Sequence, residues 1–398
     1  MMNQREIFLR HVAQTSPAPL GLEIVRASGV RLYGAAGEEY IDLIGGISVA
    51  NMGHGHPAII AAIREQADAY LHIMVYGEFV ETPQVKYAQL LCSQLPPSLD
   101  SVFFTNSGAE AVEGAMKLAK RVSNRTQVIA FSNSYHGSTQ GALSIIGDEY
   151  WRNAYRPLLP DVLHLDYNSF ESLEEITERT ACVFAETVQA EAGVLVPAEA
   201  WMKALRKRCD ETGTLLVLDE IQTGFGRTGS LWGFTRTGIV PDILLLGKAL
   251  GGGLPMGAFI ASRQLMYQLA ENPVLGHITT FGGHPLCCAA GHAALQAMLR
   301  EKVVEQVEVK GALLESLLIH PLILGTTRCG LWMAIKFDSF ETNKKIIDRC
   351  IERGVLTDWF LFASDCLRIS PPLVIGEEDL RLVAAIILSV LDEFKKPA

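Results

Sequence analysis

Residues 214–229 read Thr-Leu-Leu-Val-Leu-Asp-Glu-Ile-Gln-Thr-Gly-Phe-Gly-Arg-Thr-Gly, an apolar run that ends in carboxylates and a glycine-rich turn. Such a run is typical of a strand that is buried on both faces of a parallel sheet. Other short apolar segments alternate with helical patterns, at 102–105, 128–131, 181–185, 243–246 and 257–261. This alternation predicts an α/β domain in which helices cover a mostly parallel sheet.

The last hundred residues have a different pattern. A helical stretch is followed by strands near 330–337 and 367–369 and by a final amphipathic helix, which predicts a small α+β domain. The N-terminal segment, with strands near 30–33 and 40–43, is expected to pack with it. We therefore expect an N-terminal segment at 1–60, a large domain at 61–295 and a small domain at 296–398.

The charge and the apolar pattern exclude several classes of partner. The chain of 398 residues has 34 Lys and Arg against 44 Asp and Glu, a net charge of −10, which has the wrong sign for a nucleic-acid binder. The longest apolar run, 382–391, is shorter than the roughly 18 to 20 residues of a membrane-spanning helix. We expect no membrane partner, no secretory signal, reduced cysteines and a cytoplasmic location.

Two apparent ligand motifs fail on their context. Gly224 to Gly229 matches the dinucleotide fingerprint, but three residues separate it from the strand and no helix is expected after it. Gly247-Lys248 resembles a phosphate-binding loop, but Asp242 stands where that loop needs glycine. His54 and His56 lack a third ligand at a recognisable spacing, so we expect no metal site.

Three charged residues, Glu186, Asp219 and Lys248, lie at the ends of apolar strands, and the last two each have two interpretations. Burial at the end of the 243–246 strand would lower the pKa of Lys248 and make it a nucleophilic amine, whereas a surface lysine would stay protonated. Asp219 would need a cation, such as a protonated ring nitrogen, if it were buried, but it could also cap a turn. Ligands in open α/β sheets bind at such strand ends.

The segment 102–110 predicts a strand that leads into a helix. Ser107 and Glu110 have the spacing of a capping box, and Gly108 would leave backbone N–H groups open to a phosphate; a plain helix cap is the alternative. Downstream, Tyr135 beside a His-Gly turn could supply a flat surface for a heterocycle or belong to the core. A phosphate cradle, an aromatic surface, a carboxylate and a desolvated amine together indicate a pyridoxal phosphate site.

These motifs also carry a family resemblance. In order and spacing, 216–229, 241–243 and 247–253 resemble the signature of class III aminotransferases of pyridoxal phosphate (PLP) fold type I, the group of acetylornithine, ornithine and 4-aminobutyrate aminotransferases. Further matching segments are 53–57, 107–110, 135–137, 186–191, 279–283 and 367–373. The resemblance therefore spans nearly the whole chain.

The resemblance implies a cofactor site made by two subunits. Lys248 would be the Schiff-base lysine, Asp219 the partner of the pyridine nitrogen and Gln222 the partner of the phenolic oxygen. The other implied cofactor contacts are Ser107, Gly108 and Ala109 at the phosphate, Tyr135 and Ile221 on the two ring faces, His136 in the same turn as Tyr135, and Thr280 from the neighbouring subunit. A homodimer with shared sites follows.

The resemblance also implies a substrate site. Arg368 matches the arginine that binds the α-carboxylate of the keto acid, and Glu191 matches the glutamate that pairs with it when an ω-amine donor is bound. Ser138 stands where many members have arginine, and Ile47 replaces an aromatic residue of the ornithine enzymes. We therefore expect a donor with a less polar far end, or one bound by another cation such as Arg152 or Arg156.

The expected function is ping-pong transfer of an amino group from an amino acid or ω-amine to a keto acid, 2-oxoglutarate in the first instance. An aminomutase of the same family is the nearest alternative. A non-catalytic PLP-fold binding protein is disfavoured because Lys248, Asp219 and Gln222 are all present.

Overall fold

The expected sheet is present in the computed structural model, which describes residues 3–395. Its seven strands lie in the order β4-β10-β9-β8-β7-β5-β6. Their bounds are Ser101–Thr105 (β4), Gln127–Phe131 (β5), Val162–Leu165 (β6), Thr180–Glu186 (β7), Leu215–Asp219 (β8), Ile243–Leu246 (β9) and Gly257–Ala261 (β10). The mostly parallel sheet is thus confirmed, and β6, which the sequence analysis did not predict, forms one edge.

One strand of this sheet differs from the expectation. β10 runs antiparallel to both of its neighbours, β4 and β9. The reason is the length of the connection: only residues 247–256 separate β9 from β10. A parallel return needs a crossover of roughly a dozen residues or more, so the chain turns back as an antiparallel neighbour.

Both faces of the sheet are buried, as continuous apolar strands require. Alternate residues of a strand point to opposite faces, so β8 places Val217 on one side and Leu216 and Leu218 on the other. Helix α5 (Gly108–Ser123) packs with Val217, and helix α8 (Glu199–Thr212) packs with the opposite face. The strand ends are therefore the places where polar groups can meet a ligand.

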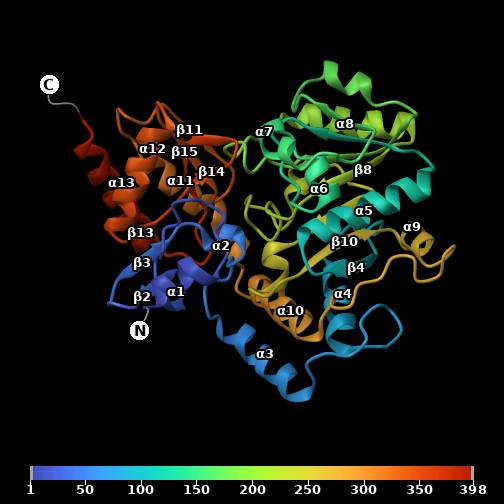
Figure 1. Cartoon of the computed structure of the whole chain (residues 1–398), viewed down its shortest axis with the longest axis horizontal. Helices are drawn as coiled ribbons and strands as arrows, with labels where there is room; N and C mark the ends of the chain where they lie inside the picture. The colour runs from blue at the N-terminus through green and yellow to red at the C-terminus, as the bar shows by residue number, and fades with distance from the viewer. Residues whose placement is uncertain (1–2, 396–398) are drawn as a thin grey trace.

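A second part of the chain is built on two smaller sheets. One has the order β11-β12-β15-β14, and the other has the order β1-β2-β3-β13. Their bounds are Ile24–Ser28 (β1), Arg31–Gly34 (β2), Glu39–Asp42 (β3), Gly325–Arg328 (β11), Met333–Lys336 (β12), Val355–Leu356 (β13), Trp359–Phe360 (β14) and Ala363–Ile369 (β15). Helices α12 (Phe340–Glu352) and α13 (Glu377–Glu393) lie beside them (Figure 1).

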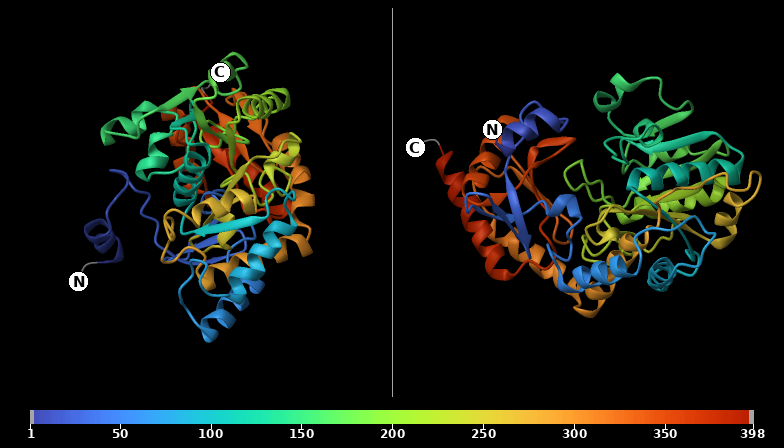
Figure 2. Two further views of the ribbon diagram at one scale, coloured as in Figure 1. Left: turned by 90° about the vertical axis from the view of Figure 1, so that its right-hand side faces the viewer. Right: turned by 60° about the horizontal axis from the view of Figure 1, so that its bottom comes forward.

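The N-terminal segment lies with this second part, because β3 pairs in parallel with β13. Helices α3 (Pro57–Ala69) and α10 (Pro285–Arg300) pack on each other, and the right view of Figure 2 shows them at the bottom, between the two parts of the chain. The domain boundaries at residues 60 and 295 stay predictions.

The glycine-rich turn after β8 joins the two parts. Arg227 is fully buried there, and its guanidinium donates to Leu331 O at 3.0 Å, Pro371 O at 2.7 Å and Asn51 Oδ1 at 2.6 Å. Residues 221–229 form turns without a helix, which agrees with the rejection of the dinucleotide motif. This motif therefore links the two parts of the chain through Arg227 and does not begin a nucleotide-binding helix.

Between residues 3 and 395, no helix has the length and apolar character that crossing a membrane requires. All eight cysteines of the sequence lie in this range and are free thiols.

Candidate active site

A cavity opens at the carboxyl ends of the central strands. Parallel pairing places Glu186, the last residue of β7, directly beside Asp219, the last residue of β8. Lys248 follows β9, the next strand. The cavity is lined by Gly108, Ala109, Tyr135, His136, Gly137, Ser138, Glu186, Ala190, Asp219, Ile221, Gln222, Thr223 and Lys248. Eight residues that the sequence analysis singled out for the cofactor thus meet in one place.

Lys248 lies in the short turn that follows Gly247, with a positive φ of 50° that non-glycine residues rarely adopt. Its Nζ donates to Oε1 of Gln222 at 2.6 Å. Burial lowers the pKa of Lys248 to about 8, although Glu191 and Asp219 act to raise it. The amine is therefore much closer to its neutral, nucleophilic form at physiological pH than a surface lysine is.

Asp219 is held by two donors. Its Oδ1 accepts the backbone N–H of Ile221 at 2.9 Å, and its Oδ2 lies 2.7 Å from Nδ1 of His136. Burial alone would lower the pKa of His136, but the bond to Asp219 and the negative charges of Asp219 and Glu186 together outweigh burial and raise it. The other ring nitrogen of His136 is buried and has no hydrogen-bond partner.

Glu186 is a residue that the sequence analysis placed at a strand end without giving it a role. Its Oε1 accepts the backbone N–H of Tyr135 at 3.1 Å, and its Oε2 accepts that of Ala190 at 2.9 Å. Burial raises the pKa of Glu186 to about 7, and the nearby Asp219 also acts to raise it. The signal that could have identified it is its position, because neighbouring parallel strands that both end in carboxylates bring those carboxylates together.

The start of helix α5 offers open backbone N–H groups. Ser107 caps this helix, with its Oγ accepting the N–H of Glu110 at 3.2 Å. In a capping box, the Glu110 carboxylate would accept the backbone N–H of Ser107. Here it accepts instead the backbone and side-chain N–H groups of Asn106, at 2.9 and 2.8 Å. A Cβ on Gly108 would approach Ile221 Cδ1 to 2.8 Å, so a larger residue here would push on the Ile221 side chain, which also lines the cavity.

The remaining predicted residues divide into those at the cavity and those outside its lining. Tyr135 and Ser138 line it, and their hydroxyl oxygens lie 3.1 Å apart. Ile47 lies outside the lining, in a left-handed turn where its φ is 61°. Thr280 is exposed. Ser107 is not part of the lining, although the two residues that follow it, Gly108 and Ala109, are.

Arg368, on β15, forms a buried bidentate pair with Glu191. Nη1 donates to Oε1 and Nη2 to Oε2, both at 3.0 Å, and Arg368 is only 2% exposed. Burial tends to raise the pKa of Glu191, but Arg368 overcomes this and holds it below its usual value. Glu191 and Arg368 also shift the pKa of Lys248 in opposite directions, which places the pair near the amine.

The two arginines considered as donor-binding cations have other partners. Arg152 donates from Nε to Glu149 at 2.9 Å and from Nη1 to Ser144 O at 3.2 Å, while Arg156 pairs with the same Glu149. Neither arginine lines the cavity, and neither Arg368 nor Glu191 is part of its lining; donor binding by Arg152 or Arg156 stays a prediction. His54 and His56 pair with Asp42 and Glu301, and residues 3–395 contain no group of side chains arranged to hold a metal ion.

Comparison with known proteins agrees with this geometry. The family model described as aminotransferase class-III matches residues 12–391. An acetylornithine aminotransferase of Methanopyrus kandleri is 38% identical over 96% of this chain and 97% of its own length. A putrescine aminotransferase of Pectobacterium atrosepticum is 37% identical over 93% of this chain and 82% of its own length.

A solved structure of ornithine aminotransferase from Toxoplasma gondii, whose description mentions PLP at the active site, superposes with a TM-score of 0.90. It is 31% identical to this chain, and the match covers 98% of this chain and 94% of the other. The chain therefore belongs to the class III aminotransferases, which are PLP-dependent enzymes with the type I fold.

Proposed function

We propose that this aminotransferase moves an amino group from an amino acid or ω-amine donor to a keto acid such as 2-oxoglutarate, in two half-reactions that share one site. The observation that carries the proposal is the buried Arg368–Glu191 pair close to Lys248. The guanidinium can bind a substrate carboxylate, and the glutamate can replace that carboxylate when the substrate has none in this position.

The residues in the cavity fit pyridoxal phosphate. Nε2 of Gln222 is buried without a partner, and its Oε1 accepts from Lys248, so the amide is oriented with a free donor. The N–H groups at the start of α5 suit a phosphate, and Gly108 and Ala109 of this first turn line the cavity. Asp219, with His136 behind it, suits a protonated ring nitrogen.

We assign each residue one task in the reaction. When bound, PLP supplies an electron sink for the bond broken at the amine-bearing carbon. Asp219 keeps the ring nitrogen protonated by charge pairing, and His136 orients Asp219. Nζ of Lys248, as a neutral amine, removes the proton from the amine-bearing carbon and holds it. Gln222 donates to the phenolic oxygen through Nε2.

The Arg368–Glu191 pair would open and close between the half-reactions. With an ω-amine donor, Glu191 stays on the guanidinium, and no buried charge is left unpaired. With a keto acid, the α-carboxylate replaces Glu191 on the same two Nη atoms. One site thus accepts two substrates whose carboxylates lie in different places.

The donor we propose has a weakly polar far end. Among the residues that the structure describes, Lys248 is the one lysine or arginine that lines the cavity. The family resemblance implies that Ser138 stands where many members have arginine. A second carboxylate on the donor would therefore lack a partner. The relatives include an enzyme named for putrescine, a donor without any carboxylate.

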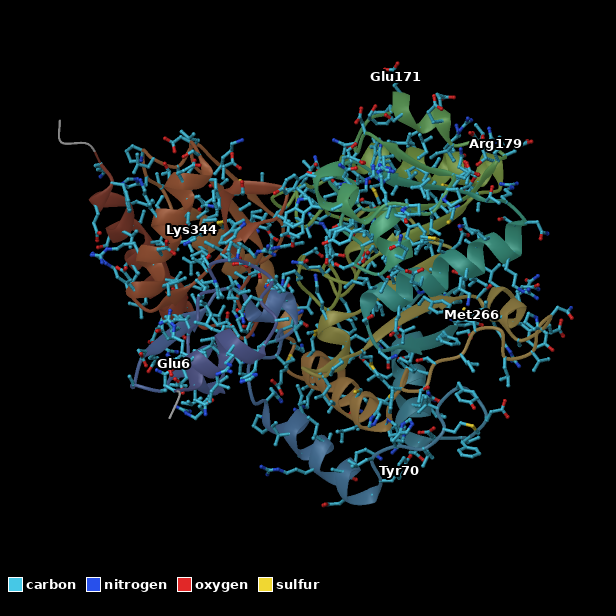
Figure 3. The ribbon with its side chains drawn as sticks, in the orientation of Figure 1. Glu6, Tyr70, Glu171, Arg179, Met266 and Lys344 are labelled. Atoms are coloured by element: carbon cyan, nitrogen blue, oxygen red, sulfur yellow. The ribbon has the colours of Figure 1, made fainter. Side chains whose placement is uncertain are left out.

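We further propose a homodimer in which Thr280 reaches the cofactor phosphate of the other subunit. Two loops, one following Tyr70 at the bottom of Figure 3 and one preceding α10, lie side by side, with the rings of His72 and Phe281 4.8 Å apart. They expose the apolar side chains Leu71, Ile73, Phe79, Val80, Val274, Leu275, Ile278 and Phe281. An apolar surface of this kind favours a protein interface.

A cytoplasmic location and the three-part division of the chain at residues 60 and 295 are also proposals. The free state of all eight cysteines supports the location, since disulfides are rare in reducing compartments.

The test is a screen of separate half-reactions. Diverse amino acids and ω-amines are added to the PLP form, and conversion to the pyridoxamine form is followed by absorbance; 2-oxoglutarate and pyruvate are then added to the converted protein. We expect conversion by at least one ω-amine and reversal by 2-oxoglutarate. Failure of every amine to convert the cofactor, or of every keto acid to restore it, would refute the proposal.

A further inference from the structure

Arg368 has a second carboxylate partner that the family resemblance did not imply. Its Nε lies 2.9 Å from Oδ1 of Asp358, whereas Glu191 occupies the two Nη atoms. The contact is an ion pair without hydrogen-bond alignment. Burial raises the pKa of Asp358 to about 6, so its carboxylate is still mostly ionised at neutral pH. One buried guanidinium thus lies between two carboxylates.

The two carboxylates differ in how they are attached. Asp358 is bound to the same strand pair as Arg368, since its backbone carbonyl accepts the N–H of Arg368 at 2.9 Å. Thr357 donates its hydroxyl to the carbonyl of Arg368, and Trp359 O accepts Nη2 at 2.9 Å. Residues 357–359 therefore fix both the backbone and the side chain of Arg368.

Glu191 comes from a different element, the loop after β7. Its carboxylate is held to the second part of the chain by one further bond, from the N–H of Leu361 to Oε2 at 2.9 Å. Rotation of the Glu191 side chain breaks this bond and the two bonds to Arg368 but leaves both sheets intact. The backbone of Asp358 is held next to Arg368 by the bond to the N–H of Arg368 and by the pairing of β14 with β15, so its carboxylate stays within reach of Nε.

We infer that Asp358 is the fixed counter-ion of Arg368 and keeps the guanidinium in place while Glu191 exchanges with the carboxylate of the keto acid. Asp358 is thus a positioning residue, and it acts through Arg368. During the exchange, Nη1 and Nη2 change partners, while Asp358, Trp359 O and the ring of Phe360, 4.5 Å from Cζ, stay. A buried guanidinium without any counter-ion would be costly, and Asp358 avoids that state.

The inference rests on the proposed function of the Arg368–Glu191 pair, and it makes a prediction that a structural role would not. An ion pair that only stabilised the fold would affect both half-reactions alike when it was removed. A counter-ion that positions Arg368 should matter in the keto-acid half-reaction, because there Glu191 has left. It should matter little with an ω-amine donor, because Glu191 then still holds the guanidinium.

The test compares Asp358→Asn with the wild type in single-turnover half-reactions. The pyridoxamine form is titrated with 2-oxoglutarate, and the PLP form is titrated with putrescine. We expect the apparent Kd for 2-oxoglutarate to rise about tenfold, the loss of one charge-assisted contact, and the putrescine half-reaction to change by less than about twofold. Equal loss in both halves, or no change in either, would overturn the inference.

Asp365→Asn is the matched control, because Asp365 lies on the same strand β15 and pairs with an exposed cation, Lys336, at 3.4 Å. We expect this variant to behave as the wild type in both halves. If Asp358→Asn does not fold, Asp358→Glu carries the test: a displaced charge should still weaken 2-oxoglutarate binding severalfold and spare the amine half. If the wild-type protein showed neither half-reaction, the proposed function would be refuted. If Arg368→Lys weakened 2-oxoglutarate binding but Asp358→Asn did not, only this inference would be refuted.

Discussion

Arg368→Lys separates the two half-reactions most directly. The guanidinium presents Nη1 and Nη2 as a planar fork, and each donates to one oxygen of Glu191 at 3.0 Å. A keto-acid carboxylate that replaces Glu191 would use the same two donors. Lysine keeps the charge but cannot offer two parallel N–H groups from one plane, so one charge-assisted hydrogen bond is lost.

The size of the effect follows from that lost bond. A hydrogen bond to a charged group contributes about 1.5 to 3 kcal/mol, which corresponds to about a ten- to a hundredfold weaker binding. We therefore expect kcat/KM for 2-oxoglutarate to fall by about this factor. The half-reaction with an ω-amine should keep most of its rate, because such a donor does not use the fork.

The assay follows the cofactor absorbance in each half-reaction separately, with Arg381→Lys as the control. Arg381 also donates two N–H groups to a carboxylate, that of Glu377, but it lies exposed on helix α13. The control should behave as the wild type. If Arg368→Lys impaired both halves to the same extent, or neither, the exchange of carboxylates on Arg368 would be refuted.

Three further predictions concern the cofactor. Lys248→Ala should abolish turnover while the protein stays folded, because the amine that binds the cofactor and moves the proton is gone; sustained transamination by this variant would contradict the assignment. Thr280→Ala should release PLP more readily, measured by dialysis of the holoenzyme against a Thr279→Ala control, and equal retention in all three proteins would count against a shared phosphate site. Since burial lowers the pKa of Lys248 to about 8, the rate at which cofactor-free protein captures added PLP should rise with pH and level off above about pH 8; a rate that climbs steadily to pH 10 would show an unperturbed lysine.

The sequence was most informative where burial removes ambiguity. A strand with a continuous apolar run, such as 215–218, must be buried on both faces, which predicts a sheet that is covered on both sides. The charged residues Asp219 and Lys248 then mark the places where such strands end. Once the strands are parallel, charged residues directly after them must lie at one edge. This is why the cofactor side of the candidate site could be predicted from the sequence.

Other features depend on contacts that no local pattern carries. Asp358 meets Arg368 because β14 pairs with β15 in a particular register, and an isolated aspartate between Thr357 and Trp359 carries no sign of that pairing. The partner of Glu110 likewise depended on the geometry of the chain at Asn106. The direction of β10, in contrast, could have been predicted, because the predicted strands at 243–246 and 257–261 leave a connection too short for a parallel return.

The cofactor residues and the carboxylate-binding arginine come from different sheets. Asp219 ends a strand of the seven-stranded sheet and Lys248 follows the next one. Arg368 lies instead on β15, in the sheet of β11, β12, β15 and β14, and residues 357–359, which hold it, lie at β14. For protein engineering this separation means that the β14–β15 hairpin can be varied as a module. Substitutions at residues 359–362 should change how Arg368 and Glu191 hold a carboxylate, because these residues contact both, while the visible absorbance of the bound cofactor is retained. A gene library restricted to this hairpin can therefore be screened for cofactor binding and for substrate use as two separate properties.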